Sequence, residues 1–370
     1  MRTKLILAAA LGTGLAVPAM AETYNYATFA PPASSNNTLA LEPAFAKIAE
    51  ESGGSIEFKL FAGGQLLGGR EMLGGLRDGI ADAGFVAPSY FISELPNAAM
   101  LSDMMPFGGD PVAVAGAMLE TMFFDCPSCM ADYTDNNLVY LGGHVPTPYR
   151  MLCSSELDGS ADSLKGLRMR SGGTAMSRTA EALGGIAVSM PAGDMYEAME
   201  RGQLDCIVGP TAWLKQYSLA EVVKTVIEEP LGVIAGLGLV TFNRQSWHDL
   251  GEEGQQMVLR QMPFIVAQST VTGFIGDDER AKETAIADHG VNFVQGEESM
   301  KAALQAANDA ARDIILAEAA ERGVEDAQAI MDAYVANLEK WRAISEEQIK
   351  GDAAVLEQVL WDEIYSKVDL

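Results

Sequence analysis

Arg170 is the residue of this 370-residue chain whose type and position best suit ligand binding. It ends a short apolar run that begins at Leu167, and the turn sequence Ser171-Gly172-Gly173 follows at once. In an open α/β sheet, ligands bind beyond the carboxyl ends of the strands. A guanidinium group at that edge can hold a carboxylate through two parallel hydrogen bonds. Arg170 and its surroundings therefore predict a site for a small organic acid.

The segment 165–210 contains the elements that would position this arginine. Short apolar runs alternate there with helical runs, and Met176, Ala180 and Leu183 repeat at the spacing of one helix face. Asp194 and Glu197 have the spacing of a capping box before a second helix. The order predicts a β-α-β-α-β unit. Its three expected strands are 167–170, 186–190 and 206–208.

An earlier part of the chain repeats the same order. Gly79-Ile80-Ala81-Asp82 precedes an apolar run that ends at Pro88, just as Gly202-Gln203-Leu204-Asp205 precedes a run that ends at Pro210. In both, the glycine is expected to end a helix and the aspartate to cap the turn into a buried strand. The repetition predicts two α/β lobes of similar build. A ligand is then expected between them, because pockets form preferentially at domain interfaces.

The charge and the length of the chain limit its possible partners and its number of domains. The chain has 51 acidic and 25 basic residues, for a formal net charge of −26, and its length suits about two domains. This acidic surface argues against nucleic acid and against anionic membranes as partners. It would also repel an anionic ligand at long range, so an anion site must be built from local arginines.

Residues 1–21 are expected to be a cleaved signal peptide. Arg2 and Lys4 form a positive n-region, residues 5–17 are largely apolar, and Ala19-Met20-Ala21 is an A-x-A cleavage site. The alternative is an N-terminal membrane anchor. No later apolar run approaches the length of a membrane-spanning helix. We therefore expect an exported, soluble protein.

Four cysteines allow three pairings in an exported protein. The C-P-S-C sequence of Cys126 and Cys129 favours a local disulfide over a redox-active pair, because no thioredoxin-like context surrounds it. Cys153 and Cys206 are either buried thiols or a second bridge. A zinc site of two C-x-x-C pairs is excluded, since the second pair is missing.

Enzyme signatures are not found. The three histidines, His144, His248 and His289, show no metal-ligand spacing and no nucleophile motif, so we expect them to be solvated or locally bonded. Asp82 and Asp205 are better interpreted as turn caps than as a catalytic carboxylate pair. No Walker-type or G-x-G-x-x-G loop occurs. The sequence predicts no enzyme, no cofactor and no metal.

Four segments together resemble a known family. LKGLRMR, MPAGDMYEAMERGQLD, TFNRQSWHDL and FAGGQLLGGREMLGGLRDGIAD look like the DctP-type substrate-binding proteins of tripartite ATP-independent periplasmic (TRAP) transporters, over nearly the whole mature chain. The resemblance implies a periplasmic α/β protein with two lobes, hinge strands and a long helix spanning both lobes. It also implies a small organic acid as ligand. The implied partners are the small and large integral membrane subunits, which move the solute with a sodium gradient.

The expected division of the chain follows this plan. The first lobe comprises 22–147 and 234–275, and the second comprises 148–233 and 276–370 with the C-terminal helices. We expect a monomer. The alternative within binding proteins is a receptor for a sensor system with the same fold.

The resemblance also implies ligand-binding roles for individual residues. Arg170 matches the arginine that pairs with the ligand carboxylate in the family, and Arg150 matches a second arginine at the start of the hinge region. Many members have an asparagine in a Q-E-N-P sequence that helps to hold the acid, whereas this chain has Gly209 there. Trp213, one helical turn further, would then supply an aromatic wall or pack in the core.

Loop positions suggest weaker candidates for ligand contact. Asn37, or its neighbour Asn36, follows the first strand, Gln65 and Tyr90 follow later strands, and Asn243 either contacts the ligand or caps a hinge. The missing asparagine and the nearby Trp213 favour a monocarboxylate with a compact or aromatic body. Dicarboxylates, sugar acids and sulfonates remain open.

Overall fold

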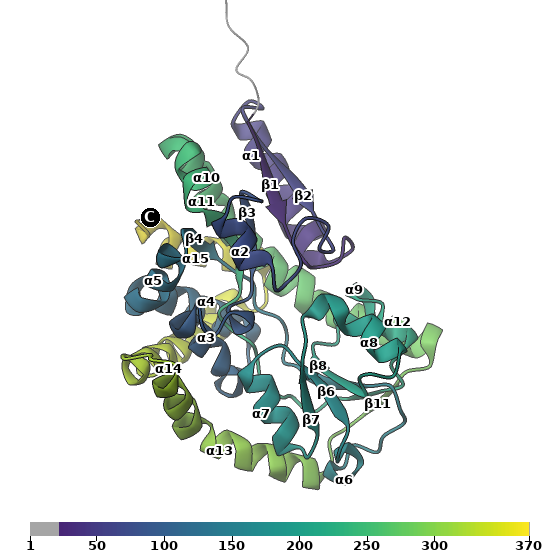
Figure 1. Ribbon diagram of the computed structural model, residues 1–370. Helices are drawn as coiled ribbons and strands as arrows, with labels where there is room; N and C mark the ends of the chain where they lie inside the picture. The colour runs from purple at the N-terminus through teal and green to yellow at the C-terminus, as the bar shows by residue number, and fades with distance from the viewer. Residues whose placement is uncertain (1–21, 370) are drawn as a thin grey trace, which may run out of the picture.

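The protein folds into two α/β lobes, seen in Figure 1 as the purple and blue upper part and the teal lower part of the ribbon. This computed structural model describes residues 22–369, so the predicted signal peptide lies outside the described residues. Each lobe is built on one sheet. The two-lobe fold expected from the sequence is confirmed.

The first lobe is built on a five-stranded sheet of order β2-β1-β3-β10-β4. Strands β3 and β10 are buried along their whole length, whereas edge strand β2 consists of half-buried and exposed residues. Its strands are β1 (Glu22–Ala27), β2 (Ile56–Phe61), β3 (Ala83–Val86), β4 (Leu138–Gly142) and β10 (Gly238–Asn243). Its helices are α1 (Glu42–Glu51), α2 (Met72–Arg77), α3 (Pro96–Asp103), α4 (Pro111–Glu120), α5 (Pro127–Asp135) and α10 (Arg244–Asp249).

The second lobe is built on a six-stranded sheet of order β11-β9-β5-β8-β6-β7. Its strands are β5 (Arg150–Cys153), β6 (Arg168–Ser171), β7 (Ile186–Ser189), β8 (Cys206–Gly209), β9 (Thr225–Ile227) and β11 (Asn292–Val294). Its helices are α6 (Ala161–Leu164), α7 (Thr174–Ala182), α8 (Met195–Glu200), α9 (Trp213–Gln216) and α13 (Glu298–Glu321). The predicted β-α-β-α-β unit is therefore confirmed as β6-α7-β7-α8-β8.

The repeated order seen in the sequence is a repeated topology. In each lobe the first strand of the unit lies between the other two, as β2-β1-β3 and as β7-β6-β8. In each, the last strand of the unit also pairs with an antiparallel strand, β10 on β3 and β5 on β8.

The two aspartates of the repeat make the same hydrogen bonds. Asp82 Oδ2 accepts from the amide of Asn25 at 2.7 Å, and Asp205 Oδ2 accepts from the amide of Arg168 at 2.8 Å. The amide of each aspartate donates in return to the carbonyl of the same residue. Each aspartate thus ties the start of one strand to the start of a neighbouring one. This is a structural role, as expected, although the bonds join two strands rather than cap a turn.

Gly79 and Gly202 have positive φ angles of 74° and 66°. This conformation ends a helix with little strain only when the residue has no side chain. The predicted capping box before α8 is not formed, because the Asp194 side chain makes no capping hydrogen bond at the start of this helix.

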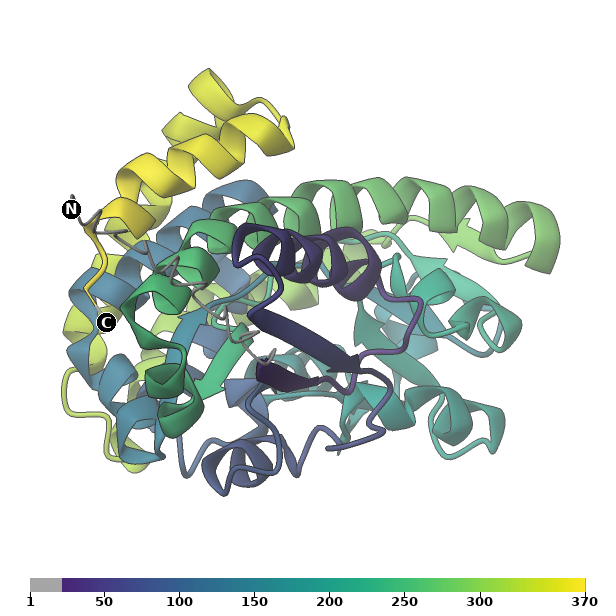
Figure 2. The ribbon, with the colours of Figure 1, turned by 90° about the horizontal axis from the view of Figure 1, so that it is seen from above.

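A helix from Gly251 to His289 joins the two lobes, as predicted. It consists of α11 (Gly251–Ala267), a π-helical segment (Gln268–Ile275) and α12 (Gly276–His289). Figure 2 shows it as the green helix that runs along both lobes. Its first part packs on α1 and β4 of the first lobe, and α12 packs on α9 of the second.

Two extended segments, 143–149 and 228–237, also cross between the lobes. They lie side by side, because the amide of Tyr149 donates to the carbonyl of Gly232 and the amide of Leu231 donates to that of Tyr149. These segments are the expected hinge connections.

The last two helices differ from the expectation. α14 (Ala327–Ile344) packs on α4, and α15 (Ala353–Glu363) packs on α11, so both cover the first lobe rather than the second. The predicted boundary that put 276–370 in the second lobe is therefore wrong at its C-terminal end. Among residues 22–369, no helix is both long and apolar enough to cross a bilayer.

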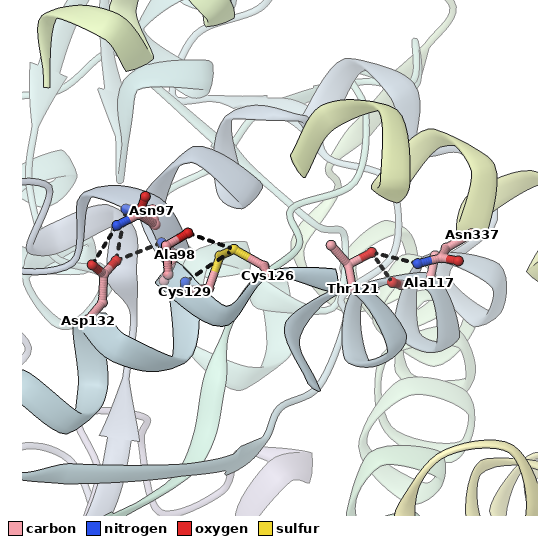
Figure 3. Close-up of a disulfide and its surroundings, with 9 residues drawn as sticks. Asn97, Ala98, Ala117, Thr121, Cys126, Cys129, Asp132 and Asn337 are labelled. Carbon is pink, nitrogen blue, oxygen red and sulfur yellow. Dashed lines mark hydrogen bonds between the residues drawn. A yellow bond between two sulfur atoms is a disulfide. The ribbon is translucent and has the colours of Figure 1, made fainter. Parts of the chain in front are cut away.

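Both pairs of cysteines form disulfides, Cys126–Cys129 as expected and Cys153–Cys206 as the second bridge. Cys126 caps α5, and Asp132 of that helix accepts hydrogen bonds from the first amides of α3 (Figure 3). The short bridge thus lies at the start of α5, the helix that holds the start of α3 in the first lobe. The long bridge joins opposite residues of β5 and β8 in the second lobe.

Candidate ligand-binding site

A cavity lies between the two lobes. Pockets for small molecules form preferentially at such interfaces. Its walls come from both lobes and from the joining helix, and they include several aromatic side chains. Apart from Tyr90, the aromatic residues that line it are Phe29, Phe85, Tyr149, Trp213, Tyr217 and Phe274.

Arg170 lines this cavity with a guanidinium group that is almost fully buried, at 1% exposure. Its Nε donates to the carbonyl of Met190 at 2.9 Å, and one Nη donates to the Tyr90 hydroxyl at 3.0 Å. The other, Nη1, has no acceptor among the described residues. A Cβ at Gly172 would lie 2.6 Å from the guanidinium, so this glycine of the turn leaves the space that Arg170 occupies.

Tyr90 connects the two lobes at the same point. Its hydroxyl accepts from Arg170 and, at 3.0 Å, from the backbone amide of Ala192. Both partners are donors, so they use the two lone pairs of the oxygen and leave the O–H free to donate. Because Tyr90 also lines the cavity, Arg170 Nη1 and the Tyr90 hydroxyl form a pair of donors suited to a carboxylate.

Trp213 lies beside this donor pair. Its ring centroid is 5.5 Å from the Arg170 guanidinium carbon, a distance typical of cation–π contact. Gly209 does not line the cavity. A Cβ at this position would lie 2.3 Å from the indole ring, so the glycine makes room for the tryptophan. Gly209, which stands where the family pattern has asparagine, thus leaves the space that the Trp213 ring occupies.

Replacing Gly209 by alanine should therefore destabilise the protein by about 1–3 kcal/mol, because an added methyl overfills a packed site. Urea unfolding checks this value. Adding Trp213→Leu should recover part of the loss, since the clashing ring is then absent. Equal stability of Gly209→Ala and the wild type would contradict the coupling.

Arg150 is not brought into the cavity. It begins β5 opposite Gly209, and one Nη donates weakly to the carbonyl of Tyr149 at 3.5 Å. Burial lowers its pKa, whereas Asp278 and the glutamates at 228 and 229 act in the opposite direction. It is Tyr149, its neighbour, that lines the cavity.

Three weaker candidates also lie outside the cavity lining. Gln65 is exposed, and Asn37 is buried with its amide nitrogen donating to the carbonyl of Pro31 at 2.9 Å. Asn243 caps α10 by accepting from the amide of Gln245 at 2.8 Å, the capping role that the sequence left open. Of the predicted site residues, the structure places Arg170, Tyr90 and Trp213 in the lining of one cavity, together with Asn36, the alternative to Asn37.

His144 is a cavity residue that the sequence did not reveal. It is 4% exposed and lies against Asn36 from a distant part of the chain, so the expectation of a solvated or locally bonded histidine is wrong. Its ring is stacked on Phe274 at 5.1 Å and meets the edge of Phe85 at 5.3 Å. Burial lowers the pKa of His144 to about 3, so the ring is neutral near pH 7.

This shift predicts a pH dependence of stability. Between the unfolded pKa of about 6.5 and the folded value of about 3, the unfolded chain binds a proton that the folded protein excludes. Stability is therefore full above pH 6.5 and falls as the pH drops, by about 2 kcal/mol at pH 5. Urea unfolding of the ligand-free protein at pH 8 and pH 5 should show this loss reduced by that amount in His144→Gln. The exposed His248 supplies the control, since His248→Gln should keep the wild-type loss.

Within residues 22–369, no group of three or more histidine, cysteine or acidic side chains is placed to hold a metal ion. The main features of the site are a buried arginine, a tyrosine hydroxyl, several aromatic side chains and a histidine–asparagine pair.

The two-lobe fold has counterparts among solved structures. A TRAP solute-binding protein of an unidentified marine microbe, in complex with 3-hydroxybenzoate, aligns with a TM-score of 0.76 at 21% identity, covering 87% of this chain and 99% of that one. A protein of Rhodoferax ferrireducens with benzoate aligns with a TM-score of 0.76 at 19% identity, covering 88% and 99%. The Bordetella pertussis receptor DctP7, which binds pyroglutamic acid, aligns with a TM-score of 0.69 at 18% identity, covering 85% and 99%. At these identities the likeness establishes a shared fold.

The family model named DctP, bacterial extracellular solute-binding protein family 7, matches residues 26–319. The match covers most of the chain, including both sheets and the cavity between them. The chain therefore belongs to the DctP family of bacterial extracellular solute-binding proteins, which bind their ligands and are not enzymes.

Proposed function

We propose that this protein captures a small monocarboxylic acid between its lobes in the periplasm. The observation that carries the proposal is the buried, unpaired guanidinium of Arg170. It forms no salt bridge with any carboxylate of residues 22–369, unlike Arg168 on the same strand, which pairs with Asp205 at 2.8 Å. A buried cation costs free energy unless an anion meets it. The carboxylate of a ligand would be that anion.

The walls of the cavity support an aromatic or compact body for the acid. Among the lining residues from the described range 22–369, Arg170 alone is charged, which favours one carboxylate over two. The molecules named for the compared structures, 3-hydroxybenzoate, benzoate and pyroglutamic acid, each have a single carboxyl group. The signal-peptide pattern and the family's extracellular character support the periplasm as location.

Delivery is the second part of the proposal. A member of this family would release its acid to the small and large membrane subunits of a TRAP transporter. Neighbouring genes for two such subunits would support this role, and a neighbouring sensor kinase would favour a signalling receptor instead.

A thermal-shift screen tests the acid assignment. A ligand at 100 times its Kd stabilises the folded state by about 2.7 kcal/mol, so a true ligand raises the melting temperature. The matched control for each acid is its uncharged amide, for example benzamide beside benzoate. We expect only the acids to raise the melting temperature. Equal shifts with acids and amides would overturn the proposal.

A further inference from the structure

Gly173, the last residue of the turn between Arg170 and α7, lies against the first lobe. A Cβ added at Gly173 would lie 2.7 Å from the Cβ of Ser89. Two carbon atoms pack at about 3.5–4.0 Å, so this position has no room for a side chain. Ser89 belongs to the 3-10 helix Pro88–Tyr90, which follows β3 of the first lobe. The two lobes therefore come this close only because residue 173 is glycine.

This contact adjoins the donor pair of the cavity. Tyr90, the residue after Ser89, accepts a hydrogen bond from Arg170 at 3.0 Å. The start of α7 is also held by the first lobe, because the amide of Ala175 donates at 3.1 Å to Asp103, the last residue of α3. The turn before α7 is thus docked on the first lobe from both sides.

The contacts between the lobes must part when a ligand enters. Arg170 is 1% exposed and Trp213 is 8% exposed, so solvent hardly reaches either side chain. An acid can reach the guanidinium only if the lobes separate, which a hinge motion about the crossing segments permits. How closely Ser89 then returns to Gly173 determines whether the Tyr90 hydroxyl meets Arg170 again.

We propose that Gly173 is a positioning residue for the acid site, because closure of the lobes onto this glycine brings the Tyr90 hydroxyl against Arg170. Gly173 itself is not among the described residues that line the cavity, so it acts through this pair. A side chain at position 173 would hold the lobes apart where the donor pair forms. The inference rests on the proposed function, since it takes the acid at Arg170 as given.

Gly173→Ala tests the inference. Gly173 has an extended backbone, with φ 166° and ψ 174°, which alanine also adopts, so the added methyl meets Ser89 without straining the turn. The probe is whichever of benzoate, 3-hydroxybenzoate and pyroglutamate raises the wild-type melting temperature most. We expect the Kd to rise at least about tenfold, as for an overfilled contact. The rise should lie mainly in koff, measured by stopped-flow tryptophan fluorescence, because the closed state is the one that is destabilised. An unchanged Kd would overturn the inference.

Two further variants locate the effect at the contact. Gly109→Ala adds the same methyl where no heavy atom of residues 22–369 would lie within 4 Å, so its Kd should stay within about twofold of the wild type. Ser89→Gly removes the carbon that the new methyl meets, and the nearest remaining atom, the Cα of residue 89, lies 3.8 Å away. In this background Gly173→Ala should therefore change the Kd by less than about twofold. A tenfold rise in both backgrounds would contradict the contact.

Thermal melting shows whether each variant folds. If Gly173→Ala alone does not fold, the double variant with Ser89→Gly decides the matter. A folded double variant that binds the acid supports the contact, and any other result overturns it. Failure of the proposed function looks different, because then no acid would raise the wild-type melting temperature more than its amide does.

Discussion

Replacing Arg170 by glutamine should raise the Kd for the acid at least about 100-fold, or about 2.7 kcal/mol. The reason is the open Nη1, which is buried and has no acceptor among residues 22–369. A hydrogen bond between charged groups contributes about 1.5–3 kcal/mol, and more is lost when the partner charge stays buried without it. Arg170→Lys should retain part of the affinity, because lysine keeps the charge without the planar fork. Isothermal titration measures both.

Arg168 provides a matched control on the same strand. Its side chain is 42% exposed and already paired with Asp205, so Arg168→Gln removes the same charge without touching the cavity. We expect its affinity to stay within about twofold of the wild type, as for loss of an exposed ion pair. Thermal melting verifies that each variant is folded. Full affinity in a folded Arg170→Gln protein would refute the role given to this residue.

Removing the disulfide Cys153–Cys206 should cost about 4 kcal/mol of stability, whereas removing Cys126–Cys129 should cost about 2 kcal/mol. The sequence separations are 53 and 3 residues, and a longer closed loop restricts the unfolded chain more. The long bridge also joins β5 to β8, whose other neighbour is the Arg170 strand β6.

Urea unfolding of the two double-alanine variants under oxidising conditions measures this difference. Each variant serves as the control for the other, because both remove one bridge and two sulfur atoms. A larger loss on removing the short bridge would contradict the loop-entropy argument.

The elements of the second lobe could be predicted from the sequence because their signals are local. Helical spacing, Gly-Gly turns and the repeated G-x-x-D sequence fixed the unit around Arg170 and its counterpart in the first lobe. The C-terminal helices could not be assigned in this way. An amphipathic pattern indicates that a helix has a buried face, but not which lobe covers it, and α14 and α15 proved to pack on the first.

The same distinction, between local sequence signals and contacts of distant segments, applies to the site. Arg170 and Tyr90 follow directly after strands or lie at their ends, so strand position was a usable signal. Arg150 also lies at a strand end, yet strand position alone does not determine where a long side chain points. Asn36 and His144 are separated by 108 residues in the sequence and meet only in the folded protein, so no local sequence pattern indicates their contact.

The order of strands in the two sheets has a consequence for how the chain folds. In the second lobe, β5 to β9 follow one another within residues 150–227, and only the edge strand β11 comes from further along. In the first lobe, β4 pairs only with β10, which lies about a hundred residues later in the sequence. Until that segment is present, β4 and the inner edge of β3 remain without partners. During folding, these two edges must therefore be kept from pairing wrongly for longer than any edge of the second lobe, whose central strands can assemble early.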